Sequence, residues 1–419
     1  MSFDFVVKNA RGVTRQSHGP AAGLLDIGIA KGRIAVIGPA LAHDGPVYDA
    51  GGQLVVPGLV ETHIHLDKTC ILDRCTICEG SVQEAIRETA RAKLAFTEDD
   101  IYARARRTLE KAIASGTQHM RAHTEIDPRI GLKGYRAIRQ LARDYAWAIN
   151  LSLCVFPQEG LTNDPGAEEL LIEACKMGAG AIGGAPYIDT DPNAQIARIF
   201  DLARRFDLDV DFHLDFDLDP GWMHVDEVCR QTERYGWGGR VAAGHMTKIS
   251  AMPPDQQIAM AQRLANAGVA VTVIPSTDLF LMGRGADHSI PRGVTRADRL
   301  AQNGVTVSLA TNNVMNAFTP FGDASLVRMA NLFANIAQLG RPADFETCLE
   351  LVSTRAARLM NIADYGIALG HPADLVVIAA ESAANAVAEI AQPLAGFKRG
   401  VRTFTRALPV LHPPTVPLA

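Results

Sequence analysis

Residues 54–68 read LVVPGLVETHIHLDK, an apolar run that ends in two histidines, an aspartate and a lysine. Successive side chains of a β-strand point to opposite faces, so His63 and His65 share one face at the strand's end. Two imidazoles held in this way can bind one divalent metal ion and leave positions open for water and substrate. A lone histidine pair is weak evidence, because ordinary buried histidines are common. The stretch predicts a metal site only if other strands supply further ligands.

Seven more apolar runs that end in polar residues follow along the chain, and they alternate with helical patterns. The runs are MRAHTEID (120–127), AINLSLCVFPQ (148–158), AGAIGGAPYID (179–189), LDVDFHLDFD (208–217), RVAAGHMT (240–247), VAVTVIPSTD (269–278) and VTVSLATNN (305–313). The predicted helices cover residues 82–94, 98–115, 135–144, 167–177, 193–206, 223–235, 254–267 and 296–303. Apolar strands alternating with helices are typical of a parallel sheet, and eight such units predict a (β/α)8 TIM-like barrel.

Short strand-like runs with turn residues flank this pattern at both ends of the chain. They cover residues 4–13, 24–38, 46–58, 370–380 and 396–407, and glycines punctuate them as turn residues. We expect the N-terminal and C-terminal runs to pair as one small β-sandwich. The predicted organisation is a small β-domain of residues 1–56 plus 365–419, beside a metal-dependent hydrolase barrel of residues 57–364. A Pro-rich tail follows Ala407.

The composition is that of an ordinary globular enzyme, with 47% hydrophobic and 21% charged residues in a chain of 419. The net charge of −5 and the lack of a basic run argue against a nucleic-acid partner. The first residues do not form an export signal, and no apolar stretch reaches membrane-spanning length. Seven scattered cysteines do not suggest a disulfide framework. We therefore expect a cytoplasmic enzyme with neither nucleic-acid nor membrane partners.

The active site of such a barrel lies at the C-terminal ends of its strands, so the polar residues at these ends are candidates for the chemistry. Four of the 12 histidines occur there, a set that packing alone would not select: His63, His65, His213 and His245. The other candidates are His123, Glu125 and Asp127 on strand two, Gln158 and Glu159 on strand three, Asp215 and Asp217 on strand five, Asp278 on strand seven, and Asn312 and Asn313 on strand eight.

Several of these candidates also have an ordinary structural interpretation. His123 fits a hydrogen-bonded structural histidine, and His245 fits a satisfied buried imidazole as well as a substrate-binding or basic one. The alternating aspartates at 215–219 fit a solvated loop. Asp215 and Asp217 nevertheless share strand parity with His213, so one of them could lean over a bound metal.

The motifs resemble the amidohydrolase superfamily and, within it, the branch of cytosine deaminase and N-isopropylammelide amidohydrolase. VVPGLVETHIHLDK (55–68) is similar to the opening metal strand of that branch, and VFPQEG (155–160) to its substrate-glutamine segment. VDFHLDFD (210–217) and AAGHMT (242–247) are similar to the segments of its third metal histidine and its strand-six histidine. The run from residue 311 to residue 340 resembles the stretch that holds the last ligand. The resemblance covers nearly the whole chain.

The resemblance implies a role for each matching residue. His63, His65 and His213 would bind one divalent metal ion, Zn²⁺ or Fe²⁺, with Asn312 at the position of the last ligand. His245 would polarise the substituent of the attacked carbon, and Gln158 would read the heterocycle, with Phe216 and Asn313 beside it. The resemblance also implies a homo-oligomer.

The sequence departs from its relatives at two of these positions. Where the branch has a metal-binding, proton-accepting aspartate on strand eight, this chain has Asn312. Where the cytosine deaminases have a proton-shuttling glutamate, it has Phe216, whose ring cannot move a proton. Lys68, which matches the ammelide side of the branch, could assist instead, as could Asp215 or Asp217.

Strand four bears on the number of metal ions. Superfamily members with two metals bridge them through a carboxylated lysine on that strand, but AGAIGGAPYID (179–189) contains none. The resemblance therefore implies a mononuclear site and disfavours ring-opening hydrolases.

Three functions remain open. The first is a mononuclear metal-dependent hydrolase of the deaminase type, acting on an exocyclic amine or amide of a nitrogen heterocycle such as a pyrimidine, triazine or pterin. The alternative is a heterocycle-binding relative whose hydrolysis is impaired or lost through Asn312 and Phe216. The third is a cyclic-amide hydrolase, which needs a second metal. The number of bound metal ions, one, none or two, distinguishes them.

Overall fold

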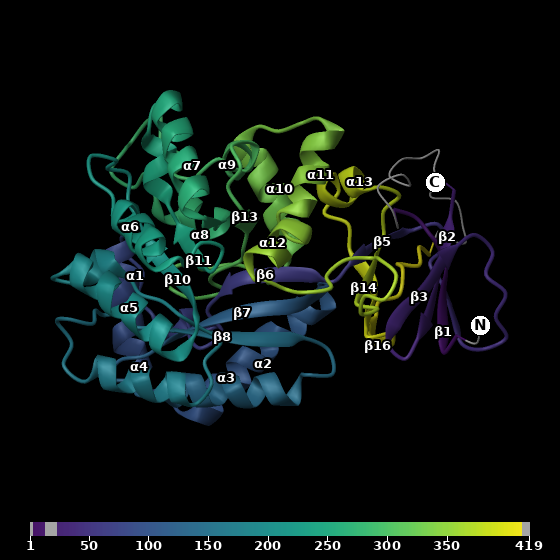
Figure 1. Ribbon diagram of the computed structural model, residues 1–419, viewed down its shortest axis with the longest axis horizontal. Helices are drawn as coiled ribbons and strands as arrows, with labels where there is room; N and C mark the ends of the chain where they lie inside the picture. Colours follow the sequence, from purple (N-terminus) through teal and green to yellow (C-terminus); the bar gives the residue numbers. More distant parts are fainter. Residues whose placement is uncertain (1–2, 13–22, 413–419) are drawn as a thin grey trace, which may run out of the picture.

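A computed structural model of the chain describes residues 3–12 and 23–412. Val13, which ends the first predicted strand run, and the last part of the Pro-rich tail lie outside the described residues. The ribbon has two parts, a large α/β body and a smaller all-β unit in which purple N-terminal and yellow C-terminal strands lie together (Figure 1).

The large body is built around eight parallel strands in chain order, each hydrogen-bonded to the next. They are β6 (Leu59–Ile64), β7 (Thr117–Glu125), β8 (Asn150–Phe156), β9 (Ala181–Ile182), β10 (Asp209–Leu214), β11 (Val241–His245), β12 (Val269–Val273) and β13 (Val307–Leu309). A parallel bridge between Ile64 and Asn312 joins the first strand to the segment after the last. The predicted TIM-like barrel is confirmed.

The helices of the body lie outside the strands. Eight of them match the predicted helices: α1 (Val82–Lys93), α2 (Glu98–Ala114), α3 (Lys133–Asp144), α4 (Ala167–Lys176), α5 (Pro192–Phe206), α6 (Val225–Tyr235), α7 (Pro254–Ala267) and α9 (Ala297–Gln302). Side-chain caps explain several boundaries; for example, the Ser81 hydroxyl accepts the Glu84 amide at the start of α1. The structure adds α8 (Pro275–Leu281), α10 (Leu326–Ala337), α11 (Pro342–Glu350), α12 (Thr354–Leu359) and α13 (Ala383–Ala388).

The segment after β12 differs from the prediction. The run of residues 269–278 was expected to be one strand ending in Asp278, but β12 ends at Val273 and α8 begins at Pro275. Proline has no amide hydrogen to donate to a sheet, and its fixed φ suits the first turn of a helix. Asp278 therefore lies in a helix that follows the strand.

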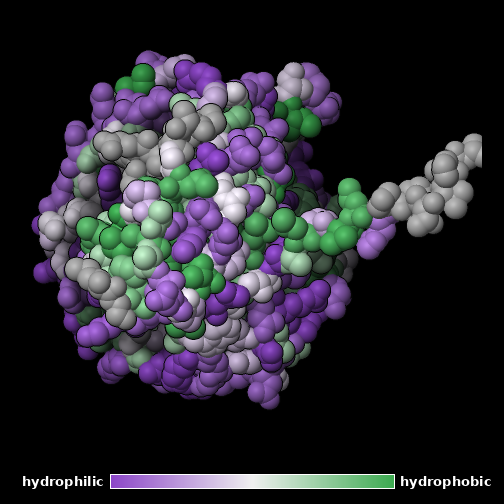
Figure 2. All heavy atoms as spheres, turned by 90° about the vertical axis from the view of Figure 1, so that its right-hand side faces the viewer, coloured by the Kyte–Doolittle hydropathy of each residue, from purple (hydrophilic) through white to green (hydrophobic). Residues whose placement is uncertain are grey.

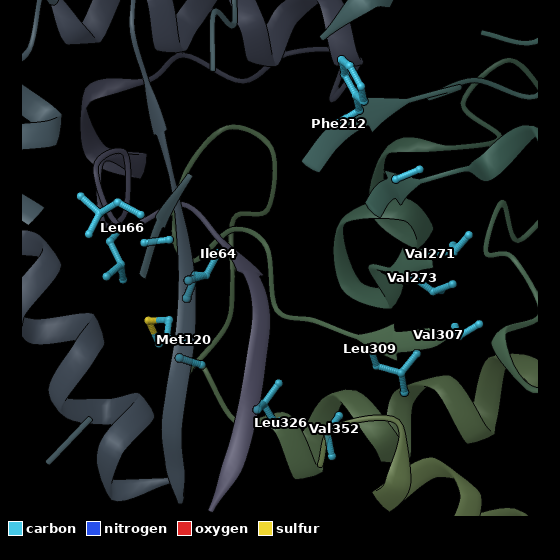
Figure 3. Packing of buried hydrophobic residues seen from close by; sticks show 14 of the residues in the cluster. Ile64, Leu66, Met120, Phe212, Val271, Val273, Val307, Leu309, Leu326 and Val352 are labelled. Carbon is cyan, nitrogen blue, oxygen red and sulfur yellow. The ribbon is translucent and has the colours of Figure 1, made fainter. Parts of the chain in front are cut away.

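Apolar side chains from the strands and helices form one large core. Figure 3 shows members of this cluster from several strands of the barrel, among them Ile64, Met120, Val271 and Leu309, together with Leu326 of α10. Burial of both faces explains why the strands read as nearly continuous apolar runs. The core fixes the strand ends, and hence the side chains that they carry.

The smaller unit consists of two four-stranded sheets. One has the order β3 (Arg33–Gly38), β2 (Leu25–Ala30), β1 (Phe5–Ala10), β4 (Val47–Asp49), and the other β16 (Val401–Thr405), β15 (Pro393–Lys398), β14 (Leu375–Ile378), β5 (Leu54–Pro57). Val7, Ile27, Val55, Val377 and Phe397 belong to the apolar cluster that both sheets share. A small sandwich built from both ends of the chain is confirmed, whereas the domain boundaries at 56/57 and 364/365 stay a prediction.

Apolar side chains are exposed at this end of the molecule. Val401 is 67% exposed, and in the tail Leu408, Val410 and Leu411 are 61%, 74% and 88% exposed. Figure 2 faces this end and shows hydrophobic residues in several groups among polar ones. Such patches often meet a partner, but the expected homo-oligomer stays a prediction. Within the described part of the chain, no helix combines the length and apolar character needed to cross a membrane.

Asp374 joins the sandwich to the barrel. Its carboxylate accepts hydrogen bonds from the Lys398 ammonium at 2.5 Å and the Arg399 amide at 2.8 Å, and its Oδ2 lies 3.4 Å from His119 Nε2 on β7. Burial acts to raise the pKa of Asp374, but His119 and Lys398 outweigh it and hold the pKa at about 2. The carboxylate thus stabilises the fold above pH about 4, near its unfolded pKa, and this contribution is lost as the pH falls to about 2.

We expect Asp374→Asn to lower the free energy of unfolding at pH 7 by about 3 kcal/mol, because it leaves the buried Lys398 ammonium without its carboxylate partner. Urea unfolding at pH 7, 4 and 3 measures this effect. The variant should also lose less stability than the natural protein between pH 4 and 3. Equal losses in the two proteins would show that Asp374 does not titrate as described.

Candidate metal centre and active site

Strand β6 carries an irregularity that includes His63, and His65 follows the end of the strand. Its register against β7 shifts between Glu61 and Ile64, as in a β-bulge, which bends a strand and re-aims its side chains. The Glu61 carboxylate accepts the amides of His63 and Thr311, each at 3.0 Å, and so connects β6 to the segment after β13. Burial raises the pKa of Glu61 to about 7 despite these bonds. In the sequence, Glu61 is not distinguished from an ordinary polar residue of a strand.

Three histidines converge inside the barrel. His213 Nε2 lies 3.0 Å from His63 Nε2 and 3.0 Å from His65 Nε2. All three side chains are buried, and together they form a group able to hold a metal ion. An ion about 2.0–2.1 Å from each nitrogen in tetrahedral geometry would keep the nitrogens about 3.3 Å apart, close to what is observed. The structure thus brings together the three histidines proposed as ligands from β6 and β10.

These histidines are in the protonation state that metal binding requires. Burial lowers the pKa of each well below its ordinary value, and the nearby Lys68 ammonium acts in the same direction. The rings are therefore neutral, as ligands must be. His65 Nδ1 lies 3.2 Å from the carbonyl oxygen of His123. Because a carbonyl oxygen can only accept, Nδ1 carries the proton and the lone pair is on Nε2.

Close packing holds the rings in place. The Phe156 ring at the end of β8 stacks on His213 with centroids 4.3 Å apart. Gly244 on β11 lies against His63, where a Cβ would come within 3.0 Å of the imidazole. A larger residue at Gly244 would push this ring out of its position.

His245 at the end of β11 lies beside this group. Its Nδ1 is 2.7 Å from Asp278 Oδ1, and its ring lies against the tilted Phe216 ring with centroids 3.7 Å apart. The centroid of His213 is 5.8 Å away. Burial raises the pKa of Asp278, although His245 opposes the rise. With Nδ1 engaged by the carboxylate, Nε2 is the nitrogen left for a substrate.

Lys68 and Gln158 lie in a buried charged network on the other side. Lys68 Nζ donates to Glu125 Oε1 at 2.7 Å and approaches Gln158 Oε1 at 3.4 Å. Lys93 of α1, which the sequence analysis missed, donates to Glu125 at 3.1 Å and to Asp127 at 2.7 Å. Gln158 Nε2 is buried and has no partner. The network orients Gln158 so that its amide nitrogen remains a free donor.

Asp215 and Asp217 are not part of the histidine group. At Asp215 the chain turns into the left-handed region, with φ of 49°, and its carboxylate accepts the amides of His224 and Val225 before α6. The Asp217 carboxylate lies 3.3 Å from Lys248 and is half exposed. The expectation that one of them approaches a metal assumed that the strand alternation of side chains continues past His213. Strand β10 ends at Leu214, so this alternation does not extend to Asp215 and Asp217.

The two asparagines after β13 have different surroundings. The backbone of Asn312 makes two hydrogen bonds: its N–H donates to the His63 carbonyl at 2.9 Å, and its carbonyl accepts the His65 N–H at 2.8 Å. The side-chain Oδ1 of Asn312 is buried and has no partner. Asn313 Oδ1 accepts a hydrogen bond from Asn316 at 2.7 Å. Only Asn312 therefore keeps a free buried oxygen that could act as a neutral ligand.

A second group of possible ligands consists of His63, His123 and Asp211. The His123 ring stacks on His63 at 3.7 Å with an angle of 21°. Nearly parallel rings cannot direct their lone pairs to one ion. The Arg121 guanidinium, 2.9 Å from Asp211 Oδ2, would also repel a cation. This group is therefore a poor second metal site.

Apolar residues gather where the chain leaves the strands. Phe216, Leu281, Met282 and Phe318, which follow β10, β12 and β13, form one cluster, and a cavity of about 400 Å³ opens beside it. A larger cavity of about 780 Å³ lies along β5, α11 and α12. The histidines line neither cavity, so the chemistry of the residues, and not cavity size, identifies the candidate site.

Comparisons with known proteins agree with this arrangement. A sequence profile of the amidohydrolase family matches residues 46–149 and 142–403. A pterin deaminase of Rhizobium rhizogenes is 28% identical over 379 residues, which cover 85% of this chain and 82% of that protein. The crystal structure of 5-methylcytosine deaminase from Klebsiella pneumoniae has a TM-score of 0.91 and 28% identity, covering 98% of this chain and 100% of that chain.

A second solved structure gives the same result. N-isopropylammelide isopropylaminohydrolase from Burkholderia multivorans has a TM-score of 0.83 and 26% identity, covering 95% of this chain and 97% of that chain. The resemblance seen in the sequence motifs is confirmed by these matches. The chain belongs to the amidohydrolase family and is an enzyme that acts on carbon–nitrogen bonds.

Proposed function

We propose that the chain is a mononuclear metal-dependent hydrolase of the deaminase type, acting on an exocyclic amine or amide of a nitrogen heterocycle. The convergence of His63, His65 and His213 carries this proposal. The similar proteins are named for acting on a pterin, on 5-methylcytosine and on N-isopropylammelide, each a nitrogen heterocycle. We also propose a cytoplasmic location and a homo-oligomer, as expected from the sequence.

The residues around the histidines have matching roles. Bound Zn²⁺ or Fe²⁺ would lower the pKa of a water molecule from about 15.7 to about 7 and so supply hydroxide at neutral pH. His245, held by Asp278, lies beside the ligands and can polarise or protonate the group that leaves. On the other side, Gln158 Nε2 and Lys68 offer donors to a ring carbonyl or ring nitrogen.

Three aromatic residues lie against polar residues of the site, and we propose that aromatic rings of this kind pack against the flat ring of the substrate. Phe156 stacks on His213, the Phe216 ring lies tilted against His245, and the Phe318 ring centroid lies 4.3 Å from the Lys68 ammonium. Planar apolar walls with a few convergent polar groups are typical of small-molecule sites. Asp215 is bound to backbone amides, so we no longer propose it as an acid–base group.

The alternative of a heterocycle-binding relative with weak hydrolysis is supported by Asn312 and Phe216. General acid–base groups typically contribute about 10²–10⁴-fold to a rate. Two such groups of the branch are missing here, and among the described residues the His245–Asp278 pair remains a candidate to replace them, as do Lys68 and Asp217. The balance between the two functions depends on what these groups can do.

Metal analysis together with a substrate panel tests the proposal. The protein as purified is assayed for zinc and iron, for release of ammonia from pterin and 5-methylcytosine, and for release of isopropylamine from N-isopropylammelide. We expect about one metal equivalent and turnover of at least one of these rings. Absence of metal would favour the binding relative, and two equivalents would favour the cyclic-amide hydrolase.

We expect Asn312→Asp to tighten metal binding. Three neutral imidazoles and a neutral amide leave the charge of the ion uncompensated, whereas a carboxylate cancels part of it. Mutations of residues that only hydrogen-bond the ligands alter metal affinity by about 10–100-fold. We therefore expect at least about a 10-fold lower Kd for Zn²⁺, measured by competition with a chelator.

Asn313→Asp is the matched control, because the neighbouring side chain is bound to Asn316 and should leave the Kd nearly unchanged. A higher Kd for Zn²⁺ and a lower activity in Asn312→Asp would contradict the prediction. In that case Asn312 is suited as it stands to the metal and substrate of this enzyme.

A further inference from the structure

Two buried polar atoms face each other without a hydrogen bond. His63 Nδ1 and Asp211 Oδ1 are 4.0 Å apart, both side chains are fully buried, and neither atom has another partner. Unpaired buried polar atoms are rare in folded proteins, and each calls for an explanation. Here the two atoms are complementary, since an Nδ1–H of His63 can donate to the carboxylate.

The surroundings hold the carboxylate firmly. Arg121 donates to Asp211 Oδ2 at 2.9 Å, and the always-charged guanidinium favours the ionised carboxylate. The backbone is equally constrained, because a Cβ on Gly183 of the neighbouring segment would come within 1.9 Å of the Asp211 carbonyl oxygen. Asp211 also lies two residues before His213 on β10, so one strand carries both a ligand and this carboxylate.

The imidazole of His63 is also constrained in the direction it can move. His123 stacks on one face of the ring, and Gly244 leaves room for its edge. These contacts allow a shift within the ring plane but oppose tilting. A shift of about 1 Å would bring Nδ1 into the normal hydrogen-bonding range of about 2.7–3.2 Å from Asp211. The same shift would keep Nε2 directed at the other two histidines.

We propose that Asp211 is a positioning residue of the metal centre: it accepts a hydrogen bond from Nδ1–H of His63, directs Nε2 to the ion, and supplies the negative charge that Asn312 lacks. The inference rests on the proposed function, since it assumes one ion at the three histidines. It explains the role of the second group of possible ligands without a second metal. Carboxylates that bind a metal-ligating histidine in this way fix its tautomer and raise its basicity.

The first test is the affinity of the protein for Zn²⁺. We expect Asp211→Asn to weaken it by about 10–100-fold, the usual cost of losing such a partner. Asp209→Asn is the matched control, because Asp209 lies on the same strand and within 3.5 Å of Arg121 but contacts no ligand histidine. The control should keep the natural Kd within about threefold. An unchanged Kd in folded Asp211→Asn would overturn the proposal.

The second test asks whether Asp211 compensates for Asn312. In the Asn312→Asp background a carboxylate is already present, so Asp211→Asn should cost less Zn²⁺ affinity than it does alone. A double-mutant cycle of Kd values measures this coupling. Additive effects would overturn the compensation of charge.

A measurement on the natural protein decides the matter if Asp211→Asn does not fold. With ¹⁵N-labelled histidine and Zn²⁺ added, His63 should be protonated on Nδ1 and its proton should be shifted downfield by the carboxylate. Protonation on Nε2 would overturn the proposal. If the natural protein binds no Zn²⁺, the proposed function fails as well, whereas a bound ion with an unaffected Asp211→Asn removes only this inference.

Discussion

Replacing His213 by alanine is expected to remove both the metal ion and turnover. His213 Nε2 lies 3.0 Å from the Nε2 atoms of both His63 and His65. Its loss would leave only these two histidines, at the end of β6, to hold the ion. Loss of an outer partner costs about 10–100-fold in metal affinity, and loss of a direct ligand should cost more than about 100-fold. Turnover should fall by more than about 10⁴-fold, because hydroxide at neutral pH depends on the bound ion.

Metal content after gel filtration and steady-state rates on the substrate found with the panel measure these effects. His119→Ala is the control, since His119 is also buried on a barrel strand but interacts with Asp374 of the sandwich. It should lower the melting temperature while keeping the ion and the rate per folded molecule. A full metal equivalent in His213→Ala would show that the histidine group is not the metal site.

Replacing His245 by alanine is expected to lower kcat by about 10²–10⁴-fold, the range of general acid–base catalysis, with metal content unchanged. Asp278→Asn should lower kcat as well, because a neutral carboxamide no longer stabilises the protonated imidazole that donates from Nε2. KM should change less than kcat in both variants, since neither residue forms the walls that hold the ring.

Kinetics, metal analysis and thermal unfolding of the two variants separate this role from a structural one. A buried imidazole that only packs would show a large fall in melting temperature and a nearly normal rate per folded molecule. Loss of the metal ion in His245→Ala would also contradict the prediction. It would place His245 among the ligands and not beside the substrate.

The barrel could be predicted because each strand buries both faces and each helix follows a strand at regular spacing. The parity of β-strands was enough to put His63 and His65 on one face, and the order of the strands brought His213 to them. The same parity failed at Asp215, because the strand ends one residue earlier and a left-handed turn redirects the side chain. No residue pattern in the sequence marks that turn.

Residues that act inside strands or from helices were the hardest to predict. Glu61 and Asp211 read as ordinary polar residues of buried strands, and their roles depend on partners more than 50 positions away, Thr311 and Arg121. Lys93 reaches the site from α1. Asp278 was expected at a strand end, but it lies in α8, which brings it to His245. A charge buried within a strand is the signal that could have identified Glu61 and Asp211.

The barrel closes where β6 meets Asn312, and this seam contains two of the three histidines and the residue that replaces the family's carboxylate. Opening of the seam would therefore separate candidate ligands at the same moment as it breaks backbone hydrogen bonds. An ion bound by these histidines would couple its release to the opening of the seam, and its binding free energy would add to the stability of this strand pairing. The backbone of Asn312 closes the barrel, while its side chain is the proposed neutral ligand. A substitution at Asn312 can therefore change the side chain offered to the ion while the backbone hydrogen bonds that close the barrel remain.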